Sequence, residues 1–160
     1  MPVLQIFRSI CCPGLFVTLQ NDMGRVLAFD FGTKRTGIAV TDEEQKIAFP
    51  LDTAPTHTLF DYIRAYLSNH EVERFVVGEP KKLDNTSTDA TKYVDQFMKK
   101  LNKTYPDLPI DRIDERFTSS LAFQSLIDSG VKKSERRNKE LIDKASATII
   151  LQSWIDAKSR

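Results

Sequence analysis

The chain has 160 residues, of which 41% are apolar and 28% charged, as expected for one globular domain with a substantial core. The net charge of +1 gives no overall signature of polyanion binding, so a nucleic-acid surface would have to come from local clusters of Lys and Arg. The only cysteines, Cys11 and Cys12, are adjacent, which excludes a disulfide framework or a zinc site with spaced ligands and favours a reducing, cytoplasmic setting.

Residues 1–22 differ in pattern from the rest of the chain. Their apolar run, 10–17, contains Pro13-Gly14 and is shorter than the roughly 20 residues that a membrane helix needs. No small-residue cleavage pattern precedes Asn21-Asp22, which argues against a secretory signal. We therefore predict a flexible N-terminal extension at 1–22, followed by one compact domain at 23–160.

The order of the predicted elements indicates an α/β fold. Apolar periodicity predicts strands at 26–31, 36–41, 46–51, 74–78 and 110–113, and helices at about 58–69, 88–102, 118–128 and 139–157. The first three strands are joined by short turns and form an antiparallel meander, after which helices and strands alternate. This order is that of the ribonuclease-H-like fold, a five-stranded mixed sheet flanked by helices.

Asp30 lies inside the first apolar strand, directly before the turn that begins at Gly32. An ionised Asp in a buried strand costs several kcal/mol unless a cation or hydrogen bonds compensate it. The position therefore suggests a functional carboxylate. The alternative is an Asp that merely caps the turn.

Two further carboxylates fall at positions that call for an explanation. Asp143 shares a helical stripe with Ala147, Ile150 and Trp154, so it lies on an otherwise apolar face. The nearby helix N-terminus stabilises its charge by only about 0.5 kcal/mol, less than desolvation costs, so a bound metal is the better account. Glu115 follows the fifth strand, where the chain turns into a helix. The alternatives are a helix-dipole partner for Asp143 and an ion pair with a neighbouring Arg for Glu115.

Four motifs in order resemble those of the YqgF/RuvX family: FDFGTKRTGIAV at 29–40, VVGEP at 76–80, DERFTS at 114–119 and IDKASATIILQ at 142–152. Members of that family are described as pre-16S rRNA nucleases and also as Holliday junction resolvases. The resemblance covers about residues 23–157. It implies that Asp30, Glu115 and Asp143 form an acidic site that holds Mg²⁺ or Mn²⁺, the hard cations that prefer oxygen ligands, and hydrolyses phosphodiester bonds.

By this resemblance, the 5′ end of precursor 16S rRNA is the leading substrate. A four-way DNA junction and a catalytically inactive nucleic-acid-binding protein are the alternatives. The sequence shows no motif that reads bases or 2′-hydroxyl groups, so it leaves open whether the substrate is RNA or DNA. It also leaves open whether the protein is a monomer or a homodimer.

Glu79 departs from the family pattern, because many members have an apolar residue after this Val-Gly. It is either a fourth metal ligand or a loop residue paired with Lys81 or Lys82.

Clusters of cations around the three carboxylates are candidate phosphate contacts. The segment 132–139 carries five positive charges and one negative charge and immediately precedes the helix of Asp143. It is either a phosphate-binding segment or an ordinary solvated connection. The predicted nucleic-acid-binding residues are Lys34, Arg35, Lys81, Lys82, Arg116, Lys132, Lys133, Arg136 and Arg137.

Overall fold

The computed structural model describes residues 24–79, 89–114, 118–130, 132 and 138–159. The predicted extension, 1–22, lies outside the described residues. The described part contains strands β1 (Arg25–Phe31), β2 (Arg35–Thr41), β3 (Ala48–Pro55), β4 (Val72–Glu79) and β5 (Ile110–Asp114), helices α1 (Leu59–Leu67), α2 (Asp89–Thr104), α3 (Thr118–Asp128) and α4 (Lys139–Lys158), and a 3₁₀ turn η1 (Thr56–Thr58). This order confirms the predicted one.

The predicted bounds are wrong chiefly at the third strand, which begins at Ala48 instead of Lys46 and continues to Pro55. Asp42 Oδ1 accepts hydrogen bonds from the backbone N–H groups of Lys46 and Ile47, which keeps both residues in the turn. Among the described strands, β3 pairs with β2 alone, and such an edge strand tolerates its two prolines because one side needs no donors.

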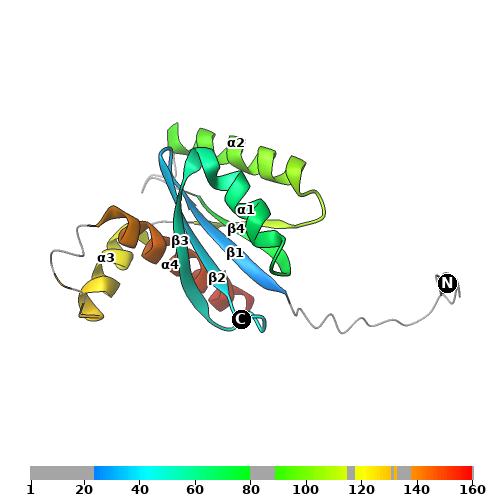
Figure 1. Ribbon diagram of the computed structural model, residues 1–160. Helices are drawn as coiled ribbons and strands as arrows, with labels where there is room; N and C mark the ends of the chain where they lie inside the picture. Colours follow the sequence, from blue (N-terminus) through cyan, green and yellow to red (C-terminus); the bar gives the residue numbers. More distant parts are fainter. Residues whose placement is uncertain (1–23, 80–88, 115–117, 131, 133–137, 160) are drawn as a thin grey trace, which may run out of the picture.

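The sheet has the order β3-β2-β1-β4-β5. Strands β1, β2 and β3 are antiparallel, whereas β4 and β5 run parallel to β1. Helices α1 and α2 cover one face of the sheet, and α4 crosses the other face over β1, β2 and β3 while α3 packs on α4 (Figure 1). This mixed sheet between helices is the ribonuclease-H-like architecture that the sequence predicts.

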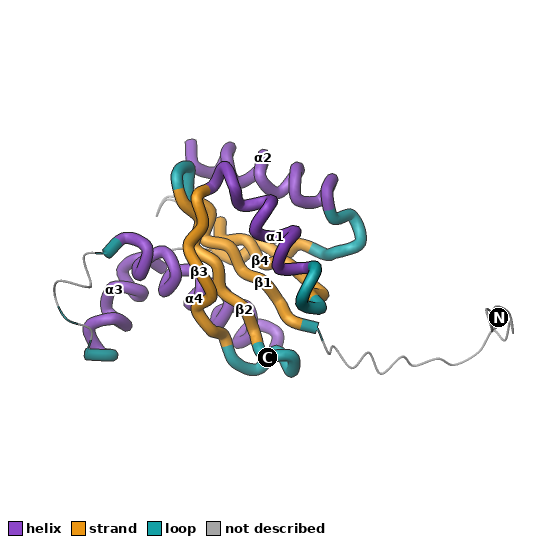
Figure 2. Tube along the Cα trace, viewed as in Figure 1, coloured by secondary structure: helices purple, strands orange, loops and turns teal. Residues whose placement is uncertain are grey.

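The alternating side chains of the strands form two cores, one on each face of the sheet. Leu27 and Phe29 of β1 belong to the core under α1 and α2, whereas Val26 and Ala28 belong to the core under α4. Because successive side chains of a strand point to opposite faces, Asp30 continues the second series and faces α4. The tube view shows α4 lying along that face (Figure 2).

Candidate metal and nucleic-acid site

Asp30 lies near the end of β1, directly opposite Gly37 of the antiparallel strand β2. Its side chain is partly buried on the α4 face. The site is therefore at the end of the sheet where β1 turns into β2.

Gly37 lets α4 approach the sheet closely beside Asp30. A Cβ atom built on Gly37 would lie 2.0 Å from the carbonyl oxygen of Asp143 and 2.5 Å from its carbonyl carbon. No side chain fits in that space, so the backbone of α4 contacts β2 directly at this point. A glycine inside a predicted strand is a sequence signal for such a close approach.

Asp143 is held by an ion pair within the site. Arg35, the first residue of β2, donates from Nε to Asp143 Oδ2 at 3.1 Å, and the two side chains are 39% and 27% exposed. The expectation that Asp143 has only a metal to compensate its charge is therefore wrong. Arg35, which the sequence suggests as a phosphate contact, orients a carboxylate of the site.

No ion pair joins Asp30 to a cation of the described residues, and the pKa of its carboxyl is raised. Burial, together with the negative charge of Asp143, raises the pKa of the Asp30 carboxyl to about 6, and the hydroxyl of Ser146 partly opposes this change. The ionised form of this carboxylate is therefore less stable than that of an exposed Asp, and a bound cation would stabilise it.

Ser146 is a polar residue of the site that the motif-based prediction does not single out. Its Oγ is buried and makes no hydrogen bond of acceptable geometry with the described residues, although the hydroxyl lies close enough to favour the Asp30 carboxylate. It follows Asp143 by three residues and thus shares its helix face. That spacing is the sequence signal that would have identified it.

The described donors fit a hard divalent cation. Two carboxylates converge from β1 and α4, one with a raised pKa, and a buried hydroxyl beside them has unused hydrogen-bonding capacity. Oxygen ligands of this kind suit Mg²⁺ and Mn²⁺. Across the described residues no group of three His, Cys, Asp or Glu side chains gathers, and the predicted third ligand, Glu115, lies outside them.

Glu79 is neither a ligand partner of Asp30 nor a loop residue. It ends β4 in the same alternating series as Phe75 and Val77, which places it on the opposite face of the sheet from Asp30. There its Oε1 lies 3.6 Å from a guanidinium nitrogen of Arg112, which also pairs with Asp95 of α2 at 2.7 Å. The interpretation as a fourth metal ligand is therefore wrong, because it did not take strand parity into account, whereas the predicted partners Lys81 and Lys82 lie outside the described residues.

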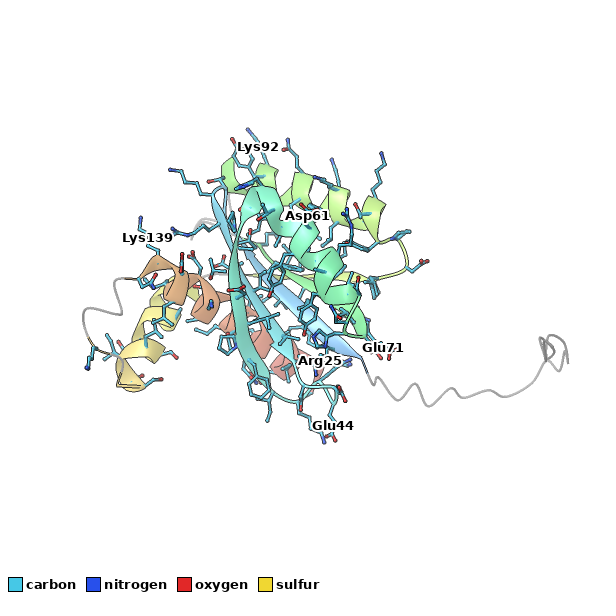
Figure 3. All side chains as sticks on the ribbon, viewed as in Figure 1. Arg25, Glu44, Asp61, Glu71, Lys92 and Lys139 are labelled. Carbon is cyan, nitrogen blue, oxygen red and sulfur yellow. The ribbon has the colours of Figure 1, made fainter. Side chains whose placement is uncertain are left out.

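Three of the predicted cations are described. Lys34 is exposed in the β1–β2 turn, Arg35 pairs with Asp143, and Lys132 is exposed between α3 and α4. Lys139 projects at the start of α4, beside this end of the sheet (Figure 3). The other predicted contacts, Lys81, Lys82, Arg116, Lys133, Arg136 and Arg137, lie outside the described residues.

The start of α4 is anchored to the edge strand. Asn138 caps the helix by accepting a hydrogen bond from the N–H of Glu140 at 3.0 Å. Thr53 of β3 donates to the carbonyl of Glu140 at 2.9 Å, and Lys144 pairs with Asp52 at 3.2 Å. These contacts fix the helix turn that carries Asp143.

Comparison with protein families identifies the domain. The family model described as "RuvX: Holliday junction resolvase" matches residues 24–157. The chain belongs to the RuvX family. Three of its relatives are each named "Putative pre-16S rRNA nuclease". That of Christiangramia forsetii is 50% identical over 83% of this chain and 98% of its own. Those of Phocaeicola vulgatus and Porphyromonas gingivalis are 49% and 46% identical, over 85% and 86% of this chain and 98% and 100% of theirs.

A solved structure of Archaeoglobus fulgidus Pelota matches with a TM-score of 0.41 and 13% identity, over 88% of this chain and 38% of that one. This likeness is too weak to bear on function.

Three of the four motifs that resemble those of the RuvX family contribute residues to one end of the sheet, and residues 115–117 of the fourth, 114–119, lie outside the described residues. Residues 29–40 form the β1–β2 hairpin with Asp30 and Arg35, and 142–152 form the part of α4 that carries Asp143 and Ser146. The described part of motif 76–80 ends β4. Within the described part of this RuvX chain, no helix has the length and apolar character to cross a membrane.

Proposed function

We propose that this chain is a metal-dependent nuclease that hydrolyses phosphodiester bonds near the 5′ end of precursor 16S rRNA. The observation that carries the proposal is the convergence of Asp30 and Asp143, with Arg35 and Ser146 around them, at one end of the sheet. The names of its relatives support the choice of substrate. Since precursor rRNA is made in the cytoplasm, we place the enzyme there.

The acidic residues Asp30, Asp143 and Glu115 would hold Mg²⁺ or Mn²⁺. When bound, such an ion activates water and stabilises the leaving oxygen of the phosphodiester. Arg35 holds one oxygen of Asp143 and so fixes the orientation of that carboxylate. The Ser146 hydroxyl favours the ionised form of Asp30, which is the form that can bind a cation.

A cleavage assay at matched salt tests this proposal. We expect the full chain to cut a precursor 16S rRNA 5′ leader in Mg²⁺ or Mn²⁺ and to lose this activity in chelator. Faster cleavage of a four-way DNA junction than of the leader would contradict the proposal that precursor rRNA is the substrate and would favour a junction resolvase. Binding without cleavage of either substrate would identify an inactive nucleic-acid-binding protein.

The basic segment 132–139 is expected to contact phosphates of the substrate. Replacing Lys132, Lys133, Arg136 and Arg137 by Gln should weaken binding to unrelated sequences alike, because phosphate contacts carry no base information. Each lost contact should lower the magnitude of the slope of log K against log salt by about 0.7 on a single strand or 0.9 on a duplex. Binding titrations over a range of salt measure this slope.

Lys46→Gln is the control, since Lys46 lies in the β2–β3 turn, at the other end of β2 from the β1–β2 turn. It should leave the slope unchanged. An unaltered slope in the fourfold variant would show that the segment is only a solvated connection.

A further inference from the structure

A pocket lined by aromatic side chains lies at the same end of the sheet as Asp30, on the other face of the sheet. Phe31 follows Asp30 in β1, and its side chain points toward α1 and α2. With Phe60 of α1, Phe97 of α2 and the exposed Tyr93 and Lys100, it lines a pocket of about 240 Å³. The pocket and the carboxylates are thus on opposite sides of one strand end.

The pocket is built from aromatic rings with a cation at its wall. Phe31 and Phe97 are stacked, with ring centroids 4.5 Å apart and an interplanar angle of 19°. Phe60 packs edge-on against Phe97 at 5.9 Å, and Lys100 Nζ lies 4.3 Å from the Phe60 ring centroid. Tyr93 is 51% exposed at this site. A large aromatic ring beside a cation and left open to solvent suits a planar, negatively charged partner.

The volume of the pocket and the charges around it limit which ligands it can bind. The volume is below the roughly 300–1,000 Å³ of sites that enclose drug-sized ligands, so it admits one ring system. The exposed side of α2 presents Lys92, Lys99, Lys100 and Lys103, which complements a phosphate backbone, and Lys92 projects from the start of the helix (Figure 3). An aromatic platform flanked by cations is the arrangement that proteins use for unpaired nucleotides.

Thr56 links the pocket to the turn that follows Asp30. It lines the pocket, donates from Oγ1 to the carbonyl of Gly32 at 2.6 Å, and donates from its backbone N–H to the carbonyl of Lys34 at 3.1 Å. The turn after Asp30 and the pocket wall are therefore held as one unit.

We propose that this pocket accepts one unpaired base of a single-stranded nucleic-acid substrate, so that the strand passes over the end of β1 toward Asp30. The inference rests on the proposed function and specifies its substrate: the segment beside the cleaved bond is single-stranded. A base in a continuous duplex is stacked between its neighbours and cannot enter the pocket.

Binding of a fluorescent single-stranded oligonucleotide from the precursor 16S 5′ leader, measured in chelator by anisotropy, tests the proposal. Tyr93→Ala should weaken binding roughly 5- to 100-fold, as expected for loss of one stacked base. Tyr93→Phe, which keeps the ring, should bind like the parent, and Lys100→Gln should weaken binding. Phe49→Ala and Lys46→Gln remove an exposed aromatic ring and an exposed cation elsewhere and should change the affinity less than twofold.

A scan with single abasic sites gives a second readout. Removal of the base at one position of the oligonucleotide should weaken its binding to the parent protein. The same abasic site should not weaken binding to Tyr93→Ala any further. The pocket proposal is overturned if Tyr93→Ala binds the oligonucleotide like the parent, or if the substitution weakens binding to single-stranded and fully duplex RNA equally. It is also overturned if the losses of affinity from Tyr93→Ala and from the abasic site are additive.

These measurements separate the pocket from the proposed function because they do not require cleavage. A Tyr93-dependent base position in a protein that cuts neither substrate would refute the nuclease and retain the pocket. Metal-dependent cleavage of the leader, together with unchanged affinity in Tyr93→Ala, would support the nuclease and refute the base-binding pocket.

Discussion

Asp30→Asn is expected to remove metal-dependent cleavage while leaving the fold intact. The amide keeps the size of the side chain but loses the charge that would hold the cation. We expect the rate to fall by at least the order of 10²–10³-fold that accompanies the loss of an electrostatic group at a reaction centre. Single-turnover cleavage of the leader at saturating enzyme measures this effect.

The same variant should be more stable than the parent in chelator at pH 7.5. The pKa of Asp30 in the folded protein is about 6, above its ordinary value of 3.8, so the folded state is stabilised below pH 4 and loses that stabilisation as the pH rises through 6. The difference between the two pKa values corresponds to a loss of up to about 3 kcal/mol in the free energy of unfolding. Urea unfolding at pH 4 and pH 7.5 should show a gain for Asp30→Asn only at the higher pH. Added Mg²⁺ should stabilise the parent and narrow the gap.

Asp143→Asn should abolish cleavage too, but its stability should differ. It loses the contact with Arg35, a partly exposed ion pair of the kind that contributes about 0–1 kcal/mol. It also removes the negative charge that repels ionised Asp30, so its stability in chelator should stay close to that of the parent. Asp156→Asn, an exposed carboxylate farther along α4, is the control and should change neither property. Full activity in Asp30→Asn, or unfolding of that variant in chelator, would refute the metal site.

Gly37→Ala is expected to destabilise the protein and to misplace Asp143. The new Cβ would lie 2.0 Å from the carbonyl oxygen of Asp143, and backbone on both sides prevents an easy escape. Overpacking of this kind costs about 1–3 kcal/mol. Because α4 must move away from β2, the rate should fall on the order of 10²-fold, the effect of misplacing a reacting group by about 1 Å. Urea unfolding and single-turnover cleavage below the unfolding transition measure both changes.

Gly130→Ala provides a matched comparison. Gly130 follows α3 with a φ of +73°, so alanine is strained there, but its Cβ would meet nothing within 4 Å. This variant should lose stability and keep its cleavage rate. If Gly37→Ala behaved in the same way, the close contact between β2 and α4 would not matter for catalysis.

The sequence alone determines the order of the elements and two of the described site residues. Periods of 2.0 and 3.6 residues are local properties, so strands and helices can be recognised without knowledge of their neighbours. Asp30 and Asp143 are detectable for the same reason, since each interrupts an apolar pattern within its own element. The motifs around these two residues are also local, and they are sufficient to indicate the family.

Only the tertiary structure decided how these elements meet. The pair between Arg35 and Asp143 joins residues 108 positions apart, and the buried hydroxyl of Ser146 becomes part of the site only when α4 lies on β1. Glu79 carries the same charge as Asp30 but lies on the other face, because the register of β4 decides its direction. The pocket of Phe31 likewise depends on two helices that cross one strand end. Such contacts depend on packing between distant segments, which no local pattern in a single chain encodes.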